Sequence, residues 1–261
     1  MNWIEAIILG IVQGLTEFLP VSSSGHLEIG QVLLGTDINQ SLTFTVVVHG
    51  ATVLSTIVVF FSEIVKLLKE GLTFRYNEST KYILKIFLSM VPVLIIGLLF
   101  EEQVETLFGG NLRFVGSMLL VTALLLGLTS LKKQEGQKHI PFVDALIIGV
   151  AQALAVIPGI SRSGATISTG VLLGNKREDV ARFSFLMVLL PIIGANLLDI
   201  LKMKDAPAGG INGSVLIIGF LAAFISGLFA CRWMINIVKR GKLIYFAVYC
   251  VILGLIAIIF A

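Results

Sequence analysis

Two short polar segments hold most of the residues in this chain that could do chemistry. The first is PVSSSGH, from Pro20 to His26, and the second is PGISRSGAT, from Pro158 to Thr166. Each follows an apolar run, and polar groups at membrane depth are costly enough to mark functional sites by default. Non-helical backbone is tolerated there only where protein or a water-filled cavity surrounds it. We therefore expect both segments to line one polar site.

Arg162 is the strongest candidate for binding an anion. A guanidinium is always charged, and its planar fork fits phosphate oxygens. If the second segment opens a helix, its free N–H groups and the helix dipole also favour an anion. The residues expected to bind the ligand around Arg162 are Gly159, Ser161, Ser163, Gly164 and Thr166. The alternatives are that Arg162 snorkels to the interface or makes a structural ion pair.

The first segment adds groups that could transfer a proton. Gln13 and Glu17 are four residues apart and share one helix face. A glutamate, a serine and a histidine together can activate a hydroxyl or a water, or hold a metal ion. The candidates are catalytic Glu17, Ser23 and His26, with Gln13, Ser22, Ser24 and Gly25 binding the ligand. The alternative is that Glu17 only neutralises Arg162.

Composition places these residues in a membrane protein. Of 261 residues, 56% are hydrophobic and 13% are charged, with a mean hydropathy of +0.98. Soluble proteins carry about 25% charged residues. The net charge of +3 is small, and the basic residues lie between apolar runs. That pattern favours membrane topology and argues against nucleic acid as a partner.

The apolar runs predict six spanning helices and two shorter elements. The six runs, each near the roughly 20 residues a span requires, cover about 42–61, 82–100, 113–131, 184–201, 214–232 and 244–260. Runs 3–19 and 143–157 are shorter and end at the polar segments, as the first arms of re-entrant hairpins would. His49 lies in the first span without polar neighbours in the sequence and is expected to be structural.

The two hairpins also form an internal repeat. EAIILGIVQGLTEFLPVSSSGH aligns with DALIIGVAQALAVIPGISRSGA at a constant offset of 139 residues. Glycines, glutamines and serines match, not only apolar residues. Each repeat, residues 1–135 and 136–261, then holds one hairpin and three spans, and an odd number of spans inverts the second repeat. We predict an all-α polytopic membrane protein of one domain: an inverted-topology repeat with six spanning helices plus two re-entrant helix hairpins.

Charge predicts the orientation. Basic residues gather at about 66–81, 132–138, 176–182 and 239–242, whereas loop 101–111 is acidic. If the basic loops are cytoplasmic, both termini face outward, and the first hairpin enters from outside while the second enters from inside. Lys202 and Lys204 are exceptions, because they fall on the outer side.

A basic cleft within lipid suits a ligand with a phosphate head and a long apolar tail. The residues alone do not decide whether that head group is hydrolysed or transported. Transport stays an alternative because inverted repeats with broken helices are common in transporters. A purely structural membrane subunit would have no reason to bury two polar segments.

The string QGLTEFLPVSSSGH together with PGISRSGAT resembles the bacterial undecaprenyl pyrophosphate phosphatase family, also called bacitracin-resistance proteins, over essentially the whole chain. The resemblance implies hydrolysis of undecaprenyl pyrophosphate to undecaprenyl phosphate and inorganic phosphate, which recycles the lipid carrier for peptidoglycan. It also implies the bacterial cytoplasmic (inner) membrane, a site opening to the periplasmic side and a divalent cation, Mg²⁺ or Ca²⁺. Membrane lipids are further partners, and a homodimer stays open.

The family motifs fall on specific residues. The family's (E/Q)-x-x-x-E motif falls on Gln13 and Glu17, so the Gln variant leaves Glu17 as the one carboxylate and the expected metal ligand. The essential histidine falls on His26 and the motif serines on Ser22 and Ser23. On these residues we hypothesise that Arg162 binds the pyrophosphate, Ser23 or a water attacks the terminal phosphorus, Glu17 orients the nucleophile or a divalent ion, and His26 moves the proton.

Overall fold

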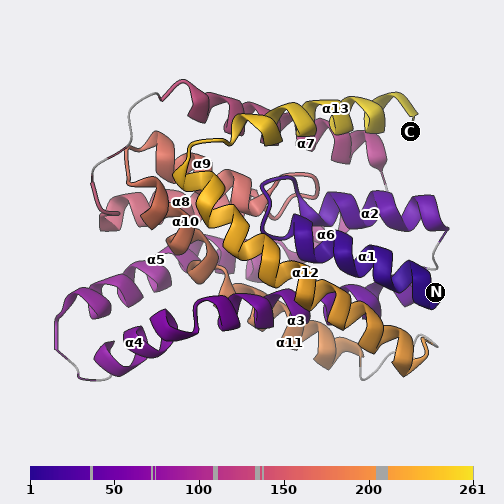
Figure 1. The fold of residues 1–261 in the computed structure, drawn as a ribbon, viewed down its shortest axis with the longest axis horizontal. Helices are drawn as coiled ribbons and strands as arrows, with labels where there is room; N and C mark the ends of the chain where they lie inside the picture. The colour runs from indigo at the N-terminus through magenta and orange to yellow at the C-terminus, as the bar shows by residue number, and fades with distance from the viewer. Residues whose placement is uncertain are drawn as a thin grey trace.

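The protein is helical throughout the part that its computed structural model describes. That part comprises residues 1–35, 38–71, 73, 75–107, 111–132, 136, 138–203 and 211–260. Thirteen helices, α1 to α13, lie within it (Figure 1). Lys204 and the side chain of Lys202, the two exceptions to the predicted charge pattern, lie outside the described residues.

The two polar segments are turns between short helices, as the sequence predicts. The first hairpin consists of α1 (Trp3–Thr16) and α2 (Ser23–Leu34), and the second of α8 (Phe142–Leu154) and α9 (Arg162–Leu172). Asn2 begins α1 with a capping box to Glu5, and Ser22 and Ser161 cap α2 and α9. No arm reaches the roughly 20 residues of a span. Each arm is therefore too short to cross a membrane as a straight helix by itself.

The remaining helices range from the seven residues of α6 to the 27 of α12. They are α3 (Ile38–Val59), α4 (Phe61–Gly71), α5 (Glu78–Leu99), α6 (Glu101–Leu107), α7 (Leu112–Ser130), α10 (Arg177–Met187), α11 (Leu189–Met203), α12 (Gly213–Lys239) and α13 (Ile244–Phe260). Four stretches are long and apolar enough to cross a membrane: α5, α7, residues 177–201 and α12. The described helices therefore define a multi-pass membrane protein.

The predicted span over 42–61 is not one straight helix. Residues 43–59 and α4 together are apolar enough to cross, but they bend by 73° at Phe60. The apolar run contains no polar residue or proline at this point, so no local pattern predicts the bend. Helix α13, at 17 residues, is also shorter than the helices that are long enough to cross a membrane. A count of six spans therefore stays a prediction.

Close helix contacts hold the hairpins in place. In Figure 1, α1 lies along α12, α8 along α5, and α7 along α13. A Cβ atom on Gly10 would lie 2.6 Å from the carbonyl oxygen of Gly219, and one on Gly149 would lie 2.3 Å from that of Ser89. Small residues allow such approach between membrane helices. The matching glycines of the two hairpins thus serve helix packing.

The chain ends and the basic loops lie at opposite ends of the molecule. Both termini are on the right of Figure 1, whereas the end of α12 and the α4–α5 connection lie on the left. Ion pairs join helices at that left end: Lys239 on α12 to Glu178 on α10 at 2.9 Å, and Arg182 on α10 to Glu63 on α4 at 3.7 Å. Charged residues from both halves of the sequence are therefore gathered at one end.

We expect Gly10→Leu to lower the thermal unfolding midpoint of the detergent-solubilised protein, because the new side chain must push α1 away from α12. Overpacking of this kind costs about 1–3 kcal/mol. Gly97→Leu on α5 is the matched control, since a Cβ there meets no atom within 4 Å. Fluorescence-detected size exclusion after heating measures both. Equal midpoints for the two variants would contradict the packing described for α1.

Candidate functional site

The two polar turns lie against each other. The hydroxyl of Ser163 donates a hydrogen bond of 3.2 Å to the carbonyl of Leu19, at the end of the first hairpin's turn. A Cβ atom on Gly164 would lie 3.4 Å from the Pro20 side chain, and one on Gly25 would lie 3.5 Å from the Cα of Gly159. Residues about 140 positions apart in sequence thus form one junction.

Two helices begin at this junction with the same cap. Ser22 Oγ accepts from the N–H of Gly25 at 3.3 Å, and Ser161 Oγ accepts from the N–H of Gly164 at 3.0 Å. The hydroxyls of Ser24 and Ser163 lie 3.3 Å from their respective caps. The first N–H groups of a helix have no partner within it. Two helix N-termini therefore present donors and positive dipole ends to the same place, which favours an anion.

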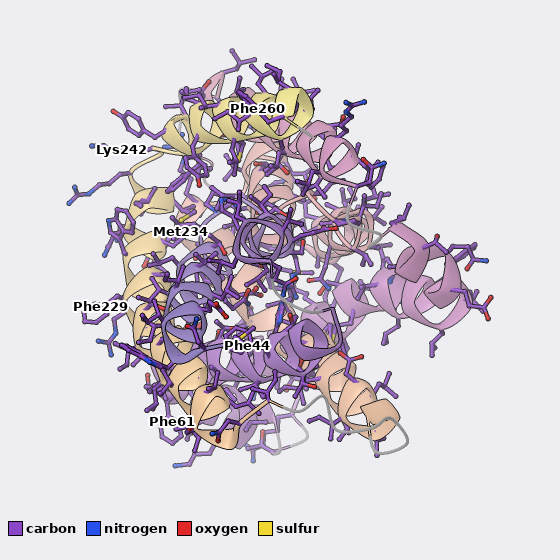
Figure 2. All side chains as sticks on the ribbon, turned by 90° about the vertical axis from the view of Figure 1, so that its right-hand side faces the viewer. Phe44, Phe61, Phe229, Met234, Lys242 and Phe260 are labelled. Carbon is purple, nitrogen blue, oxygen red and sulfur yellow. The ribbon has the colours of Figure 1, made fainter. Side chains whose placement is uncertain are left out.

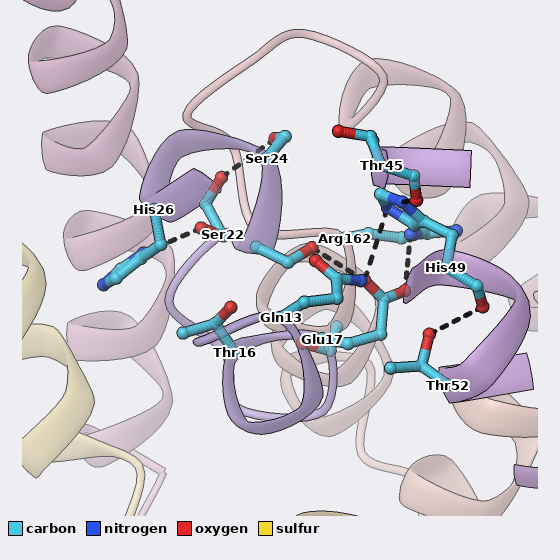
Figure 3. Close-up of polar contacts among 12 residues, drawn as sticks. Gln13, Thr16, Glu17, Ser22, Ser24, His26, Thr45, His49, Thr52 and Arg162 are labelled. Carbon is cyan, nitrogen blue, oxygen red and sulfur yellow. Dashed lines mark hydrogen bonds and ion pairs between the residues drawn. The ribbon is translucent and has the colours of Figure 1, made fainter. Parts of the chain in front are cut away.

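The Glu17 carboxylate accepts hydrogen bonds from side chains of both hairpins. It follows the last turn of α1, and its side chain is 7% exposed. Arg162 donates to Oε1 at 2.7 Å, while Ser23 and Gln13 donate to Oε2 at 2.7 and 2.9 Å (Figure 3). The ion pair neutralises two charges that would be costly to bury separately. The Arg162 side chain remains 29% exposed, so donors of its guanidinium are open to a ligand.

His49 faces this carboxylate, and the expectation that it lacks polar neighbours was wrong. Its Nδ1 lies 2.8 Å from the carbonyl oxygen of Thr45, which can only accept, so Nδ1 carries a proton. Nε2 is then directed towards Glu17, 3.9 Å from Oε2 (Figure 3). The polar neighbour comes from α1, which no local pattern in the α3 sequence indicates.

His26, by contrast, points away from Glu17 in Figure 3. Its Nδ1 lies 2.8 Å from the carbonyl oxygen of Ser22, and its Nε2 lies 2.7 Å from the hydroxyl of Tyr249 on α13. Since a carbonyl only accepts, Nδ1 is protonated, and in the neutral ring Nε2 accepts from the tyrosine. The rings of His26 and Tyr249 also stack at 5.6 Å. Tyr249 was not found from the sequence, because it lies in an apolar run far from both segments.

Buried groups on α7 hold the second turn. Thr122 Oγ1 accepts from the N–H of Ser161 at 2.9 Å and lies 3.2 Å from the carbonyl oxygen of Gly159, to which it donates. Gly159 has φ +93°, and a Cβ there would lie 2.5 Å from the carbonyl oxygen of Val115. Gly159 is therefore required by the turn and by α7. The expectation that Gly159 also helps to bind the ligand stays a prediction.

The other candidate residues divide between the junction and the protein interior. Ser22 has φ +69°, the one positive φ outside glycine in the described chain, and such strain collects at functional sites. Thr166, expected to bind the ligand, instead donates to the carbonyl oxygen of Arg162 or shares a proton with Ser184 Oγ at 2.6 Å. Its hydroxyl supports α9 and α10.

A protein-only metal site is not found among the described residues. They contain no group of three or more His, Cys, Asp or Glu side chains that could hold an ion. Both oxygens of Glu17 already accept hydrogen bonds, whereas Gln13 Oε1 is buried without a partner. One carboxylate and one amide oxygen give an incomplete shell, which Mg²⁺ completes with water and phosphate oxygens in many enzymes.

Fold and junction together define a multi-pass helical membrane protein with a polar junction formed by two helix N-termini, an arginine and a carboxylate. The chain belongs to the bacitracin resistance protein BacA family, whose model matches residues 6–256. A relative from Christiangramia forsetii is 56% identical over 263 residues, covering 100% of this chain and 99% of its own. One from Parabacteroides distasonis is 55% identical over 260 residues, covering 99% and 98%. Both are named undecaprenyl-diphosphatase.

We expect Thr122→Val to loosen the second turn while preserving side-chain volume. The substitution leaves the N–H of Ser161 and the carbonyl of Gly159 buried without their partner, which costs about 1–3 kcal/mol. Thr129→Val on the same helix is the matched control, because the buried Thr129 hydroxyl donates to its own helix, to the carbonyl of Leu126 at 2.6 Å, and to no other helix that the structure describes. Thermal midpoints in detergent compare the two, and a smaller loss for Thr122→Val would contradict the role of Thr122.

Proposed function

We propose that this protein hydrolyses undecaprenyl pyrophosphate to undecaprenyl phosphate and inorganic phosphate, recycling the lipid carrier for peptidoglycan and related wall polymers. The observation that carries the proposal is the set of Arg162, Glu17 and Ser23 at the junction of two helix N-termini. It stands in a chain 53–56% identical to several proteins named undecaprenyl-diphosphatase. The expected physiological effect of this activity is resistance to bacitracin, to which the family is linked.

The pyrophosphate binds where α2 and α9 begin. Phosphoryl transfer depends on positioning and on neutralising charge at the phosphoryl oxygens. Arg162 supplies the cation, and the N–H groups and hydroxyls of both turns supply further donors. When phosphate reaches Arg162, it replaces part of the interaction with Glu17, and that carboxylate becomes a stronger proton acceptor.

Ser23 is the proposed nucleophile. Its hydroxyl donates to Glu17 Oε2 at 2.7 Å, so Glu17 takes the proton as Ser23 Oγ attacks the terminal phosphorus. The bond to the bridging oxygen breaks, and undecaprenyl phosphate leaves. A water then releases phosphate from the phosphoserine. In the alternative, a water beside Ser23 attacks directly. His49, 3.9 Å from the same carboxylate oxygen, is placed to stabilise Glu17 or to exchange a proton with it.

His26 acts with Tyr249 in this proposal. The ring holds the carbonyl of Ser22, and therefore the strained start of α2, through Nδ1. Its Nε2 shares a proton with the Tyr249 hydroxyl, whose ring is 44% exposed. Proton movement by His26 would thus use Tyr249 as its neighbour, and Tyr249 fixes both the ring's orientation and its tautomer.

We further propose that the chain is an inverted repeat in the bacterial cytoplasmic membrane, with the site open to the periplasmic side. The matched caps at Ser22 and Ser161 support the repeat, as does the reciprocal packing of α1 on α12 and of α8 on α5. The basic end of the molecule would be cytoplasmic. The proposed divalent cation would be held by Glu17 and Gln13 Oε1 together with substrate oxygens, and it would neutralise phosphate charge.

Transport of undecaprenyl phosphate across the membrane is the alternative. Pure transport of a phosphate head group requires Arg162 and donors, but no proton acceptor beside a serine. The hydrogen bond from Ser23 to Glu17 therefore favours hydrolysis.

Phosphate release from undecaprenyl pyrophosphate by the purified protein in detergent tests the proposal, with Mg²⁺, Ca²⁺ or EDTA. We expect Arg162→Lys and Glu17→Gln each to lower kcat/KM by about a hundredfold or more, because charge stabilisation of this kind is worth that much. Arg113→Lys, at an exposed position of α7, is the control and should retain activity. Wild-type rates in Arg162→Lys would overturn the site. If a folded wild-type protein releases no phosphate, the transport alternative is favoured, and flux across liposomes tests it.

We expect Tyr249→Phe to lower kcat about tenfold with little change in KM, because it removes one hydrogen bond to His26 and preserves the stacked ring. A lost hydrogen bond of about 1.4 kcal/mol corresponds to that factor. Tyr76→Phe, at an exposed residue outside the site, is the control. Steady-state kinetics on the same substrate separate the two parameters. An unchanged kcat, or a change confined to KM, would contradict the role of Tyr249.

A further inference from the structure

A ligand-sized space lies at the basic end of the molecule, where α12 ends and α13 begins. This cavity of about 600 Å³ is lined by Trp233, Ile237, Arg240, Lys242, Tyr245 and Phe246, among others. Its volume falls within the roughly 300–1,000 Å³ typical of small-molecule sites. None of its lining residues belongs to the junction of the two hairpins. We call this space the α12–α13 groove.

Among the described residues that line the groove, the charged ones are the cations Arg240 and Lys242, with no carboxylate beside them. No ion pair of Arg240 or Lys242 is found among the described residues, although their neighbour Lys239 pairs with Glu178 at 2.9 Å. A third cation lies close by, because a Cβ on Gly241 would be only 2.6 Å from Nη1 of Arg177. Clustered cations without counter-charges favour an anionic ligand.

The opposite wall is apolar and aromatic. Trp233 and Tyr245 are 56% and 67% exposed, and Ile237 and Phe246 are partly buried beside them. Tryptophan and tyrosine gather at the level of lipid head groups, where one end of the ring is apolar and the other is wet. Lys242 lies between the end of α12 and the start of α13, at the edge of the helix assembly (Figure 2). A ligand here must be anionic at the helix ends and apolar along the helices.

We propose that the α12–α13 groove binds an anionic phospholipid, with its phosphate between Arg240 and Lys242 and an acyl chain against Trp233, Ile237 and Phe246. Free inorganic phosphate would leave the apolar wall uncovered, and a zwitterionic lipid brings an ammonium group towards the cations. Basic pockets between membrane helices on the cytoplasmic side recognise anionic head groups in this way. The site is separate from the phosphatase proposal and does not depend on it.

The groove has a structural connection to the junction of the hairpins. It is formed by the first turn of α13, and the same helix carries Cys250, whose Sγ lies 3.8 Å from the carbonyl oxygen of Pro20. Tyr249, the partner of His26, is on that helix as well. A lipid that holds the start of α13 therefore also supports the helix that contacts the first polar turn.

The two tryptophans of the chain allow a direct test. In a Trp3→Phe background Trp233, in the groove, is the single reporter. Reconstitution into vesicles with brominated phosphatidylglycerol or brominated phosphatidylcholine measures which lipid reaches it, because bromine quenches tryptophan on contact. Each cation contributes about fivefold to binding an anionic lipid. We expect phosphatidylglycerol to quench at a mole fraction about 5- to 30-fold lower, with a smaller preference at high salt.

The double substitution Arg240→Gln, Lys242→Gln should abolish this preference, and Lys242→Gln alone, as the milder change, should reduce it about fivefold. Lys66→Gln, Lys69→Gln is the control, since these exposed cations are on α4 outside the groove. The control should retain the full preference. Equal quenching by the two lipids in the Trp3→Phe protein would overturn the proposal. So would loss of the preference in the α4 variant, because it would point to surface charge in general.

Discussion

The ion pair between Glu17 and Arg162 is the interaction on which the candidate site depends. Its partners are 145 residues apart, one on each hairpin, and their side chains meet at 2.7 Å. Neither hairpin could bury its charge alone at membrane depth without a large penalty. The two halves of the chain must therefore meet at this point. The junction of two helix N-termini, with its donors for an anion, follows from that meeting.

The surrounding structure keeps this pair where a ligand can reach it. Thr122 holds the second turn from α7, and Ser163 ties it to the first turn at Leu19. The glycines of α1 and α8 let the first arms lie close to α12 and α5. In the proposed reaction the substrate's phosphate competes with Glu17 for Arg162. The group that neutralises the arginine at rest thereby becomes the acceptor for the proton of Ser23.

Local chemistry explains which parts of this arrangement were accessible from the sequence. The ends of the hairpin arms follow from Pro20, Ser22, Pro158 and Ser161, because caps and prolines act on their immediate neighbours. The pairing of Glu17 with Arg162 was one of the two alternatives that the sequence left open for Glu17. His49, Tyr249 and Thr122 could not be assigned in the same way, because the packing of α3, α13 and α7 brings them to the turns. The bend at Phe60 likewise has no local signature.

The coupling energy between Glu17 and Arg162 shows directly whether this ion pair holds the two halves of the chain together. Thermal or denaturant unfolding of Glu17→Gln, Arg162→Gln and the double variant, all in the same detergent, measures it. Removing one partner of a buried pair costs about 3–5 kcal/mol, because the other charge stays uncompensated. We predict that the double variant loses clearly less stability than the sum of the single losses. Single losses that simply add would show that the two residues do not hold the halves together.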